Sequence, residues 1–397
     1  MNKKPIFEII ADRLRQTEFK DDDIITLGKD FSLPNDEEGL KYIDGAKDGI
    51  CVYHMGAAEI TQKDIEEINT VITLANTGDY DQADSVLEKL CERIRVVNFI
   101  DELQDCILAR KDEIEDKFYI YSLHLMTQSA NIECVKAGMM IQELFGQSEE
   151  VKGMVRTLGL SDEFTLYSVF IMRNWENGNT EIMNIAKSVN GWGKIHAVHY
   201  IEPETEEIKY WLLTGAVSND VMPAYSGWDC YKKADVEAIL KKDGLTYEEL
   251  EGVLSIVDAI LDEGPVLGIS NIENPKEILL AVLKKSALFS TYASLIVAII
   301  LNFVMSSWRI PVQGIIASLF EGFAVAWMPI GFVIIAAIFA YDLSVKNGKI
   351  EIIKTMLGNI TSDRRAQALI LAWGFGGFIE GIAGYGTAVA IPAAIMI

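Results

Sequence analysis

The chain has 397 residues, with 35 Lys and Arg against 58 Asp and Glu, and a formal net charge of −23 at pH 7. Residues 271–397 carry nine basic and seven acidic residues, so the net negative charge lies entirely in the first 270 residues, whose net charge is −25. This acidity excludes nucleic acid as a partner of the front part, since phosphates require a basic surface, and it argues against an anionic membrane surface.

The first 60 residues are predicted to form a mixed N-terminal segment (1–60). Their start, MNKKPIFEIIADRLRQ, is charged and amphipathic, unlike a signal peptide. Further on, DGICVYHMG is compatible with a short strand or a loop. The chain's cysteines are odd in number and lack C-x-x-C spacing, which predicts a reduced, cytosolic front part rather than a disulfide framework; they are Cys51, Cys91, Cys106, Cys134 and Cys230.

Residues 61–265 are predicted to form an α-helical, repeat-like domain. The side chain of Thr61 is expected to accept a hydrogen bond from the backbone of Asp64 at the start of its first helix, which ends at Gly78. Pro203 suits the first turn of a later helix. Many short helices with tight turns favour a solenoid of helix pairs, with an irregular bundle as the alternative. Further helices are expected at about 112–128, 130–145, 162–175, 179–190, 192–201, 203–214 and 246–262.

A linker is expected over residues 266–286 and a membrane domain over residues 287–397. The uncharged apolar runs at 287–304 and 324–341 are predicted to be two membrane spans, because about 20 apolar residues cross a bilayer core of roughly 30 Å. The predicted fold class is therefore mainly α, with a soluble helical domain followed by two to three transmembrane helices.

A third apolar region begins near residue 366 and is still apolar at Ile397, which favours a truncated reading frame. Basic residues predict the orientation of the spans. Lys284 and Lys285 precede the first run, and the loop 346–365 holds five basic residues. The positive-inside rule puts both on the cytoplasmic side. The expected localisation is the cell membrane, with the acidic N-terminal domain in the cytoplasm.

Candidate chemistry in the front part is sparse. His196 and His199 lie three residues apart on one predicted helix, with Glu202 following, and two histidines and a carboxylate could hold non-haem iron. The alternative is a pair of helix-face histidines bonded to neighbouring groups. No E-x-x-H occurs, so the di-iron signature is absent, and no haem or flavin motif is found. The one G-x-G in the front part sits between helices, where no dinucleotide fold is expected.

The densest motif lies in the membrane part, GFGGFIEGIAGYGT from residue 374 to residue 387. Glycine permits close helix contact or an unwound backbone, which is tolerated at membrane depth beside protein or a water cavity. A carboxylate there is costly and marks a candidate for ion or substrate handling, so a proton-relay role is predicted for Glu380. The alternative places Glu380 at the membrane interface. The transport-like motif consists of Glu380, Gly381, Gly384 and Gly386.

The run FIEGIAGYGTAVAIPAAIM, with WMPIGFVIIAAIFAYDLSVKNGKIEIIK and ITSDRRAQALI before it, resembles the bacterial L-lactate permeases, which are proton-coupled carriers. The resemblance covers about residues 283–397 and the N-terminal part of those carriers. The acidic front part stands in place of the family's first span, and most later spans are missing. Since a carrier's repeats must enclose a midplane site, this piece is expected not to transport lactate.

The whole chain, including GWGKIHAVHYIEPETEEIKYWLL, is similar to bacterial proteins described as limonene hydroxylases. This resemblance implies a monooxygenase, an oxidoreductase that converts the monoterpene limonene to carveol and perillyl alcohol with NAD(P)H and O2. It supplies no catalytic residue, and it implies limonene as an apolar partner and a reductase or other protein partner. The alternative is a non-catalytic helical-repeat interaction module fused to an incomplete, inactive lactate permease fragment.

Overall fold

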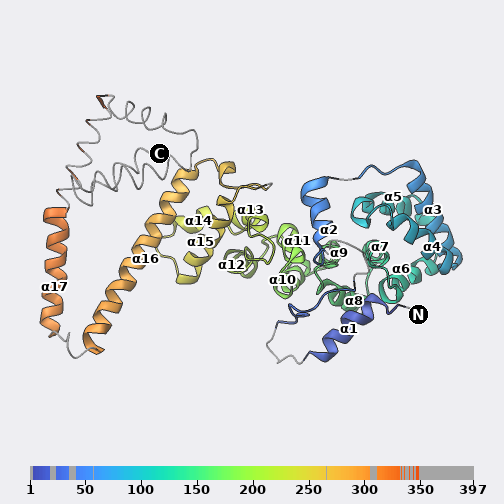
Figure 1. Cartoon of the computed structure of the whole chain (residues 1–397), viewed down its shortest axis with the longest axis horizontal. Coiled ribbons are helices and arrows are strands. Elements are labelled where there is room, and N and C mark those ends of the chain that lie inside the picture. Colours follow the sequence, from blue (N-terminus) through green and yellow to red (C-terminus); the bar gives the residue numbers. More distant parts are fainter. Residues whose placement is uncertain are drawn as a thin grey trace. The chain divides into compact units, whose positions relative to one another are not determined.

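The computed structural model describes residues 3–17, 24–34, 42–56, 58–264, 266–304 and 311–330, with a few scattered positions up to residue 347. The chain divides into two compact units, residues 1–288 and 289–397 (Figure 1). The domain boundaries expected from sequence at residues 60, 265 and 286 stay predictions.

Unit 1 is built from short helices, and no strand occurs in the part of the chain that the structure describes. The prediction of a mainly helical fold is confirmed. The elements are α1 (Ile6–Gln16), α2 (Ala46–Ile50), the π turn η1 (Cys51–Met55), α3 (Gln62–Thr77), α4 (Tyr80–Cys91), η2 (Val96–Asn98), α5 (Ile100–Ala109), η3 (Lys111–Glu113), α6 (Asp116–Gln128), α7 (Ile132–Glu143), α8 (Glu149–Gly159), α9 (Thr165–Met172), α10 (Gly178–Ser188), α11 (Trp192–Tyr200), α12 (Glu206–Thr214), α13 (Ala224–Lys233), α14 (Val236–Lys241), α15 (Tyr247–Leu261) and η4 (Ile269–Asn271).

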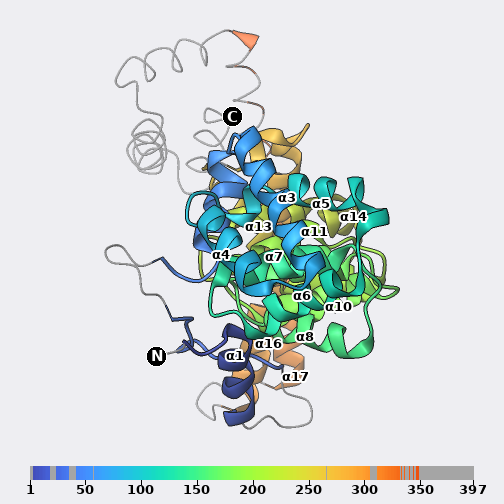
Figure 2. The same ribbon diagram turned by 90° about the vertical axis from the view of Figure 1, so that its right-hand side faces the viewer.

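Helices that follow one another in the chain pack as neighbours. The pairs α3 with α4, α6 with α7, α8 with α9 and α10 with α11 are in contact, and Figure 2 shows α6 and α7 side by side. A second set of contacts joins alternate helices, because α7 packs on α9, α9 on α11 and α11 on α13. The segment that contains α2 and η1 contacts α11 and η2. It therefore lies against the layer formed by α7, α9 and α11.

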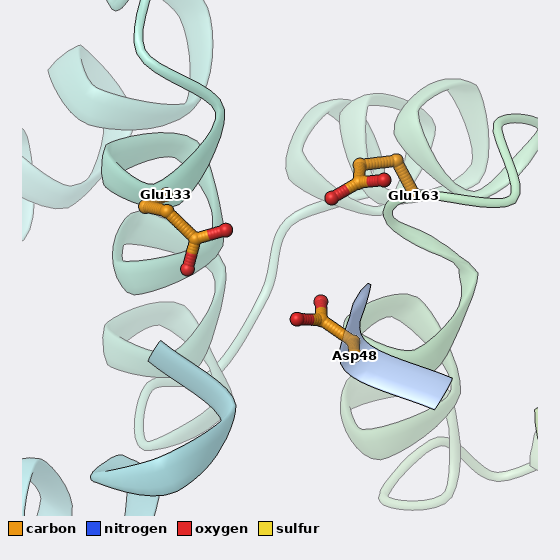
Figure 3. Close-up of side chains that lie close together, drawn as sticks. All are labelled: Asp48, Glu133 and Glu163. Carbon is orange, nitrogen blue, oxygen red and sulfur yellow. The ribbon is translucent and has the colours of Figure 1, made fainter. Parts of the chain in front are cut away.

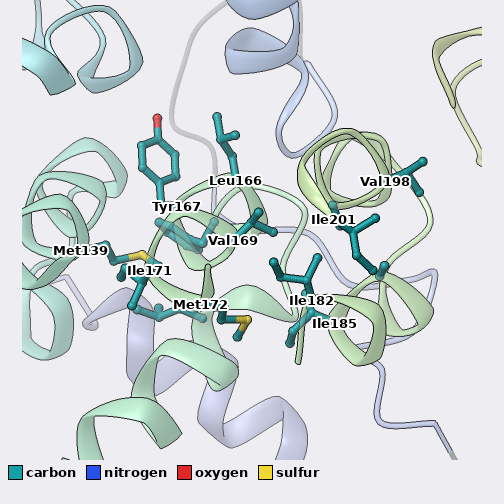
Figure 4. Close-up of a cluster of buried hydrophobic side chains, with 14 of the residues drawn as sticks. Met139, Leu166, Tyr167, Val169, Ile171, Met172, Ile182, Ile185, Val198 and Ile201 are labelled. Atoms are coloured by element: carbon teal, nitrogen blue, oxygen red, sulfur yellow. The ribbon is translucent and has the colours of Figure 1, made fainter. Parts of the chain in front are cut away.

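The core of unit 1 runs through α9. This helix is buried on all sides, with Leu166, Tyr167, Val169, Ile171 and Met172 each at most 1% exposed. Figure 4 shows these side chains between Met139 of α7 on one side and residues of α10 and α11 on the other. Burial of each large apolar side chain contributes about 1.5–3 kcal/mol relative to exposure, so this continuous apolar seam holds the successive helices together.

The start of α3 follows from local sequence. The Thr61 side chain accepts a hydrogen bond from the backbone N–H of Asp64 at 3.4 Å, and Asp64 accepts one from the backbone N–H of Thr61 at 3.0 Å. This reciprocal pair is a capping box. At the other end, Gly78 adopts φ +87°, a left-handed conformation that glycine enters without strain. Both predicted ends of this helix are confirmed.

Replacing Thr61 with alanine is expected to lower the free energy of unfolding by about 1 kcal/mol, because the N-terminal N–H groups of α3 lose their side-chain acceptor. Urea unfolding of the full chain would measure the change. Thr70→Ala is the matched control, since Thr70 is exposed in the middle of α3 and donates only to the carbonyl of Glu66. Equal effects of the two variants would contradict the capping role.

Two local predictions are wrong. The run DGICVYHMG is neither strand nor loop but helical, as the end of α2 followed by η1. Its β-branched and aromatic residues are helical because Tyr53 packs on rings from α11 and α13, and such tertiary contacts override propensity. Pro203 lies before α12 rather than in its first turn. Thr205 caps that helix by accepting from the N–H of Ile208, and threonine is a strong cap.

Helix α16 (Pro275–Val304) begins in unit 1, where Val282 is buried, and continues past residue 288. It is followed by α17 (Val312–Val325) and the π turn η5 (Ala326–Ile330). At 1.5 Å per residue the 30 residues of α16 extend about 45 Å, more than the thickness of a bilayer core.

One helix in the described part of the chain is long and apolar enough to cross a membrane. It is the Pro275–Ile296 portion of α16, with mean hydropathy 1.3. The helix that contains the first expected span begins at Pro275, before Lys284 and Lys285, and the start of the span itself at residue 287 stays a prediction. The second expected span begins within α17, and the apolar helix Gln313–Met328 is shorter than a span. The third apolar region lies outside the described residues.

Candidate functional site

Three carboxylates from separate parts of unit 1 point toward one another (Figure 3). Asp48 lies on α2, Glu133 in the first turn of α7, and Glu163 in the turn before α9. One oxygen from each lies within 4.8 Å of the others, and Asp48 is only 2% exposed. Oxygen ligands in this number suit a hard divalent cation, so composition alone would favour a metal site here.

Two basic side chains already lie among these carboxylates. The Lys136 Nζ donates to Asp48 at 2.6 Å and to Glu133 at 3.0 Å, and it also binds Glu163. Arg95 donates from Nε to Asp48 at 2.7 Å, and its Nη2 lies 2.8 Å from Glu133. Because protein cations occupy the centre of the cluster, its chemistry is that of a buried ion-pair network that fastens α2 to α7.

The charges in this network stabilise one another. Lys136 has a fully buried side chain, which disfavours its charge, yet the negative charges of Asp48, Glu133 and Glu163 raise the pKa of its ammonium group. Burial alone would raise the pKa of Asp48, but the positive charges of Lys136 and Arg95 hold it below its usual range. Asp48, Lys136 and Arg95 are therefore charged at neutral pH, and the charge of each depends on its partners.

Sequence reasoning missed this network. One signal could have found it, since Lys136 is a lone basic residue in a helix that is otherwise buried from Cys134 to Gln142. Lysine is almost never fully buried unless it is paired. Glu133 lies three residues before Lys136 on α7, but Asp48 and Glu163 are 88 and 27 residues away in the chain, so no spacing rule identifies these two.

Beside the network, the aromatic residues of η1 pack on α11 and α13. The Tyr53 ring stacks on that of His196, with centroids 5.5 Å apart, and on that of Trp192, with centroids 6.0 Å apart. Tyr225 completes the group at 5.6 Å from Tyr53. Aromatic pairs at these separations add about 0.5–1.5 kcal/mol beyond area burial. They fix the second end of the same short segment that Asp48 anchors.

The two histidines predicted as metal ligands lie in different surroundings. His196 is 1% exposed, and burial lowers its pKa to about 4; its Nδ1 lies 3.5 Å from the Tyr53 hydroxyl. His199 is partly exposed and its Nδ1 lies 2.9 Å from a carboxylate oxygen of Asp229. The described residues bring no third ligand to the pair in the way that the three carboxylates converge. Metal binding by His196 and His199 stays a prediction.

A cavity of about 570 Å³ lies between the segment 26–32, the start of α2 and the turns that flank α9 and α11. Asp162 lines it and accepts hydrogen bonds from the backbone N–H groups of Gly191 at 3.0 Å and Gly193 at 2.7 Å. Burial raises the pKa of Asp162 to about 6 despite these donors, and burial likewise raises that of Asp44, which also lines the cavity, to about 6. This is an acidic cavity that favours neutral carboxyl groups or a bound cation.

Unit 2 presents apolar side chains on its exposed surface. In α17, Phe320 and Phe323 are at least 70% exposed, and Trp327 of η5 is equally exposed. Glu321 lies among them. Together with the exposed Ile316, Leu319 and Val325, these aromatic side chains give α17 an apolar surface that suits lipid rather than water. The transport-like residues Glu380, Gly381, Gly384 and Gly386 lie outside the described residues, so their role also stays a prediction.

Comparison with known proteins identifies the character of this region. Residues 277–397 match the family model described as L-lactate permease. The chain is 42% identical over 118 residues to an L-lactate permease of Streptococcus iniae, which covers 30% of this chain and 24% of the relative. It is 44% identical over 105 residues to an L-lactate permease of Escherichia coli, covering 26% and 19%. The C-terminal part of the chain resembles the L-lactate permeases.

A relative with a different name also matches. The glycolate permease GlcA of Escherichia coli is 34% identical over 118 residues, or 30% of this chain and 21% of the relative. The chain thus spans about a fifth to a quarter of the length of the curated relatives it matches. No solved structure matches the chain. The predicted resemblance to L-lactate permeases is confirmed, with a match that begins at residue 277, and a membrane location is supported.

The predicted function as a limonene hydroxylase is wrong. The eight curated proteins that match are all named permeases, and none is named an oxygenase. An oxidoreductase activity, and in particular an NAD-dependent monooxygenase activity on limonene, therefore has no support. The expectation of NAD(P)H came from the hydroxylase resemblance alone and stays untested.

Proposed function

We propose that this protein is a helical-repeat interaction module fused to a membrane segment of the L-lactate permease type. The proposal rests on one observation: the match to the permease family and the helix that is able to cross a membrane begin at nearly the same residue. The family match begins at residue 277, and the helix that is able to cross a membrane begins at Pro275. The permease-like part therefore starts with the first membrane helix, and the helical domain lies before it in the chain.

We take the helical domain to be a solenoid, a fold that binds partners on extended surfaces, and contacts between alternate helices support this choice. Alternate helices α7, α9, α11 and α13 contact one another in sequence. Its negative charge suits a water-exposed domain that repels anionic lipid. Lys284 and Lys285 directly precede the uncharged run 287–304 of α16, and the positive-inside rule then favours a cytoplasmic position for this domain.

Membrane attachment is tested by fractionation. The full chain is expected in the membrane pellet after alkaline carbonate washing, because α16 and the segments after it are apolar. A variant that ends at Lys285 keeps the buried Val282 and is expected in the supernatant with the helical circular dichroism of a folded domain. Recovery of the full chain in the supernatant would contradict the proposal, as would pelleting of the shortened variant.

A second function is favoured by the names of the relatives. L-lactate and glycolate are both small 2-hydroxycarboxylates, so we propose this chemical class as the substrate of any transport that the membrane part supports. Glu380 is the residue proposed to carry a proton in that case. Uptake of labelled L-lactate into vesicles that contain the 397-residue chain measures this.

The two functions predict different fluxes. If the chain acts as an interaction module with a membrane anchor, uptake equals that of empty vesicles. Saturable uptake that is lost in Glu380→Gln would establish transport by these 397 residues and would overturn the anchor role. Gln313→Glu, which adds a carboxylate on the first turn of α17, serves as a control for nonspecific charge effects.

A further inference from the structure

Residues 45–55, called here the docked segment, form a short helical piece comprising the residue before α2, α2 itself and η1. Its contacts are with elements distant in sequence. Asp48 binds Lys136 of α7 and accepts a hydrogen bond from the Tyr167 hydroxyl of α9 at 2.9 Å. Tyr53 stacks on Trp192 and the neighbouring His196 of α11. The docked segment therefore lies across three helices of the repeat as a bound peptide would.

The fit between the docked segment and the layer beneath it is close. A Cβ added at Gly49 would lie 2.1 Å from the Trp192 ring, and one added at Gly45 would lie 2.6 Å from the carbonyl oxygen of Asp162. Gly45 also adopts φ +77°, which a side chain would disfavour. Glycine at both positions lets the backbone touch the helices directly.

The anchors of the docked segment are five residues apart. Asp48 is on α2 and Tyr53 is in η1, and both face the helices beneath, since Asp48 binds Lys136 and the Tyr53 ring stacks on Trp192. The surface beneath the docked segment offers two complementary binding sites, one for each anchor. Lys136 and Arg95 bind the carboxylate, and the rings of Trp192 and Tyr225 receive the aromatic side chain.

Two features distinguish this contact from an ordinary core. A buried ion-pair network contributes less stability than apolar packing of the same volume, and its best-attested use is specificity. In addition, the Nε2 atom of His196 is buried and has no hydrogen-bond partner among the described residues, although the ring lies directly under Tyr53. The docked segment thus leaves a buried polar atom unsatisfied, which a different occupant with a polar group there would satisfy.

We propose that the face of α7, α9 and α11 under the docked segment is a peptide-binding surface, which the chain occupies with its own segment in cis. The partner it fits is a short helical peptide with a carboxylate and, five residues later, an aromatic ring. This inference deepens the proposed interaction module and rests on it. A tethered segment has an effective concentration of about millimolar, so a partner binds measurably only when the cis contact is weakened.

The test uses the full chain in lipid nanodiscs and a fluorescent synthetic peptide of residues 42–56. Gly49→Ala in the chain adds a methyl group that clashes with the Trp192 ring and so weakens the contact of the docked segment. The residues that bind its two anchors are unchanged. The peptide is expected to bind this variant about tenfold or more tightly than the unmodified chain. Gly153→Ala is the matched control, since a Cβ there meets open space, and it should bind as weakly as the unmodified chain.

Peptide variants examine the two anchors. Asp48→Asn and Tyr53→Ala in the peptide are each expected to weaken binding to the Gly49→Ala chain by about tenfold, through loss of charge-assisted hydrogen bonds or of ring stacking. If circular dichroism shows that Gly49→Ala unfolds the chain, Tyr53→Ala in the chain replaces it, because this change removes volume and adds none.

Equal binding of native and variant peptides, or no binding to a folded chain whose docked segment is weakened, overturns the inference. Carbonate extraction of the same nanodisc source membranes is done in parallel. Retention in the membrane without peptide binding contradicts the docking surface alone, whereas loss of retention contradicts the proposed function itself.

Discussion

Replacing Lys136 with methionine is expected to lower the free energy of unfolding of unit 1 by about 3–5 kcal/mol. Methionine fills the same apolar volume, but it leaves Asp48, Glu133 and Glu163 with Arg95 as their one remaining cation in the network. Leaving buried carboxylates without their cation costs far more free energy than the ion-pair attraction contributes. Urea unfolding of the full chain at pH 7, followed by tryptophan fluorescence, measures the change.

Lys209→Met is the matched control for this experiment. The Lys209 ammonium group pairs with Glu206 at 2.7 Å on the surface of α12, and its side chain is 43% exposed. Surface pairs of this kind contribute about 0–1 kcal/mol, so the control should change stability little. A loss below 1 kcal/mol in Lys136→Met would show that the network is not needed for the stability of unit 1.

Replacing Asp162 with asparagine is expected to stabilise unit 1 by about 2–3 kcal/mol at pH 7 and to have little effect at pH 4. Burial raises the pKa of Asp162 from 3.8 to about 6 in the folded state. The folded protein therefore holds this proton more tightly than the unfolded chain, and the native protein loses stability as pH rises from about 4 through 6. Asparagine has no charge to bury, and its Oδ1 keeps the acceptor for Gly191 and Gly193.

Unfolding curves at pH 4, 5, 6 and 7 show whether the difference between Asp162→Asn and the native chain grows across that interval. Asp258→Asn on the exposed face of α15 is the control for general charge effects. A stabilisation that is the same at pH 4 and pH 7 would mean that Asp162 does not hold a proton in the folded state at pH 5.

The parts of the fold that depend on local rules could be predicted from sequence. The capping box at Thr61 and the left-handed Gly78 fix α3 with residues that are adjacent in the chain. The docked segment could not be predicted, because its helical state depends on Trp192 and Tyr225, more than 130 residues away. The start of α12 was predicted wrongly at Pro203, because Thr205 caps this helix and so places its first turn after the proline.

The candidate sites, too, depend on contacts between distant residues that local sequence rules do not predict. Helical spacing placed His196 and His199 on one helix, but it cannot tell that one ring is buried under Tyr53 while the other faces Asp229. Apart from the i,i+3 pair of Glu133 and Lys136, the members of the ion-pair network are brought together by tertiary packing, so no motif describes it. The permease-like part was recognisable because membrane segments carry their signal in composition and in glycine-rich runs.

Val282 of α16 belongs to the buried core of unit 1. This core is therefore complete only after the start of α16, the first membrane helix, has left the ribosome. Synthesis proceeds at about 5–20 residues per second, so the 43 residues from the end of α15 to the end of α16 take about 2–9 seconds. During that interval the core lacks the first turns of α16 and stays open on that side. Recognition of the apolar turns by the targeting machinery then coincides with closure of the domain, so delivery to the membrane and final folding take place in the same short window.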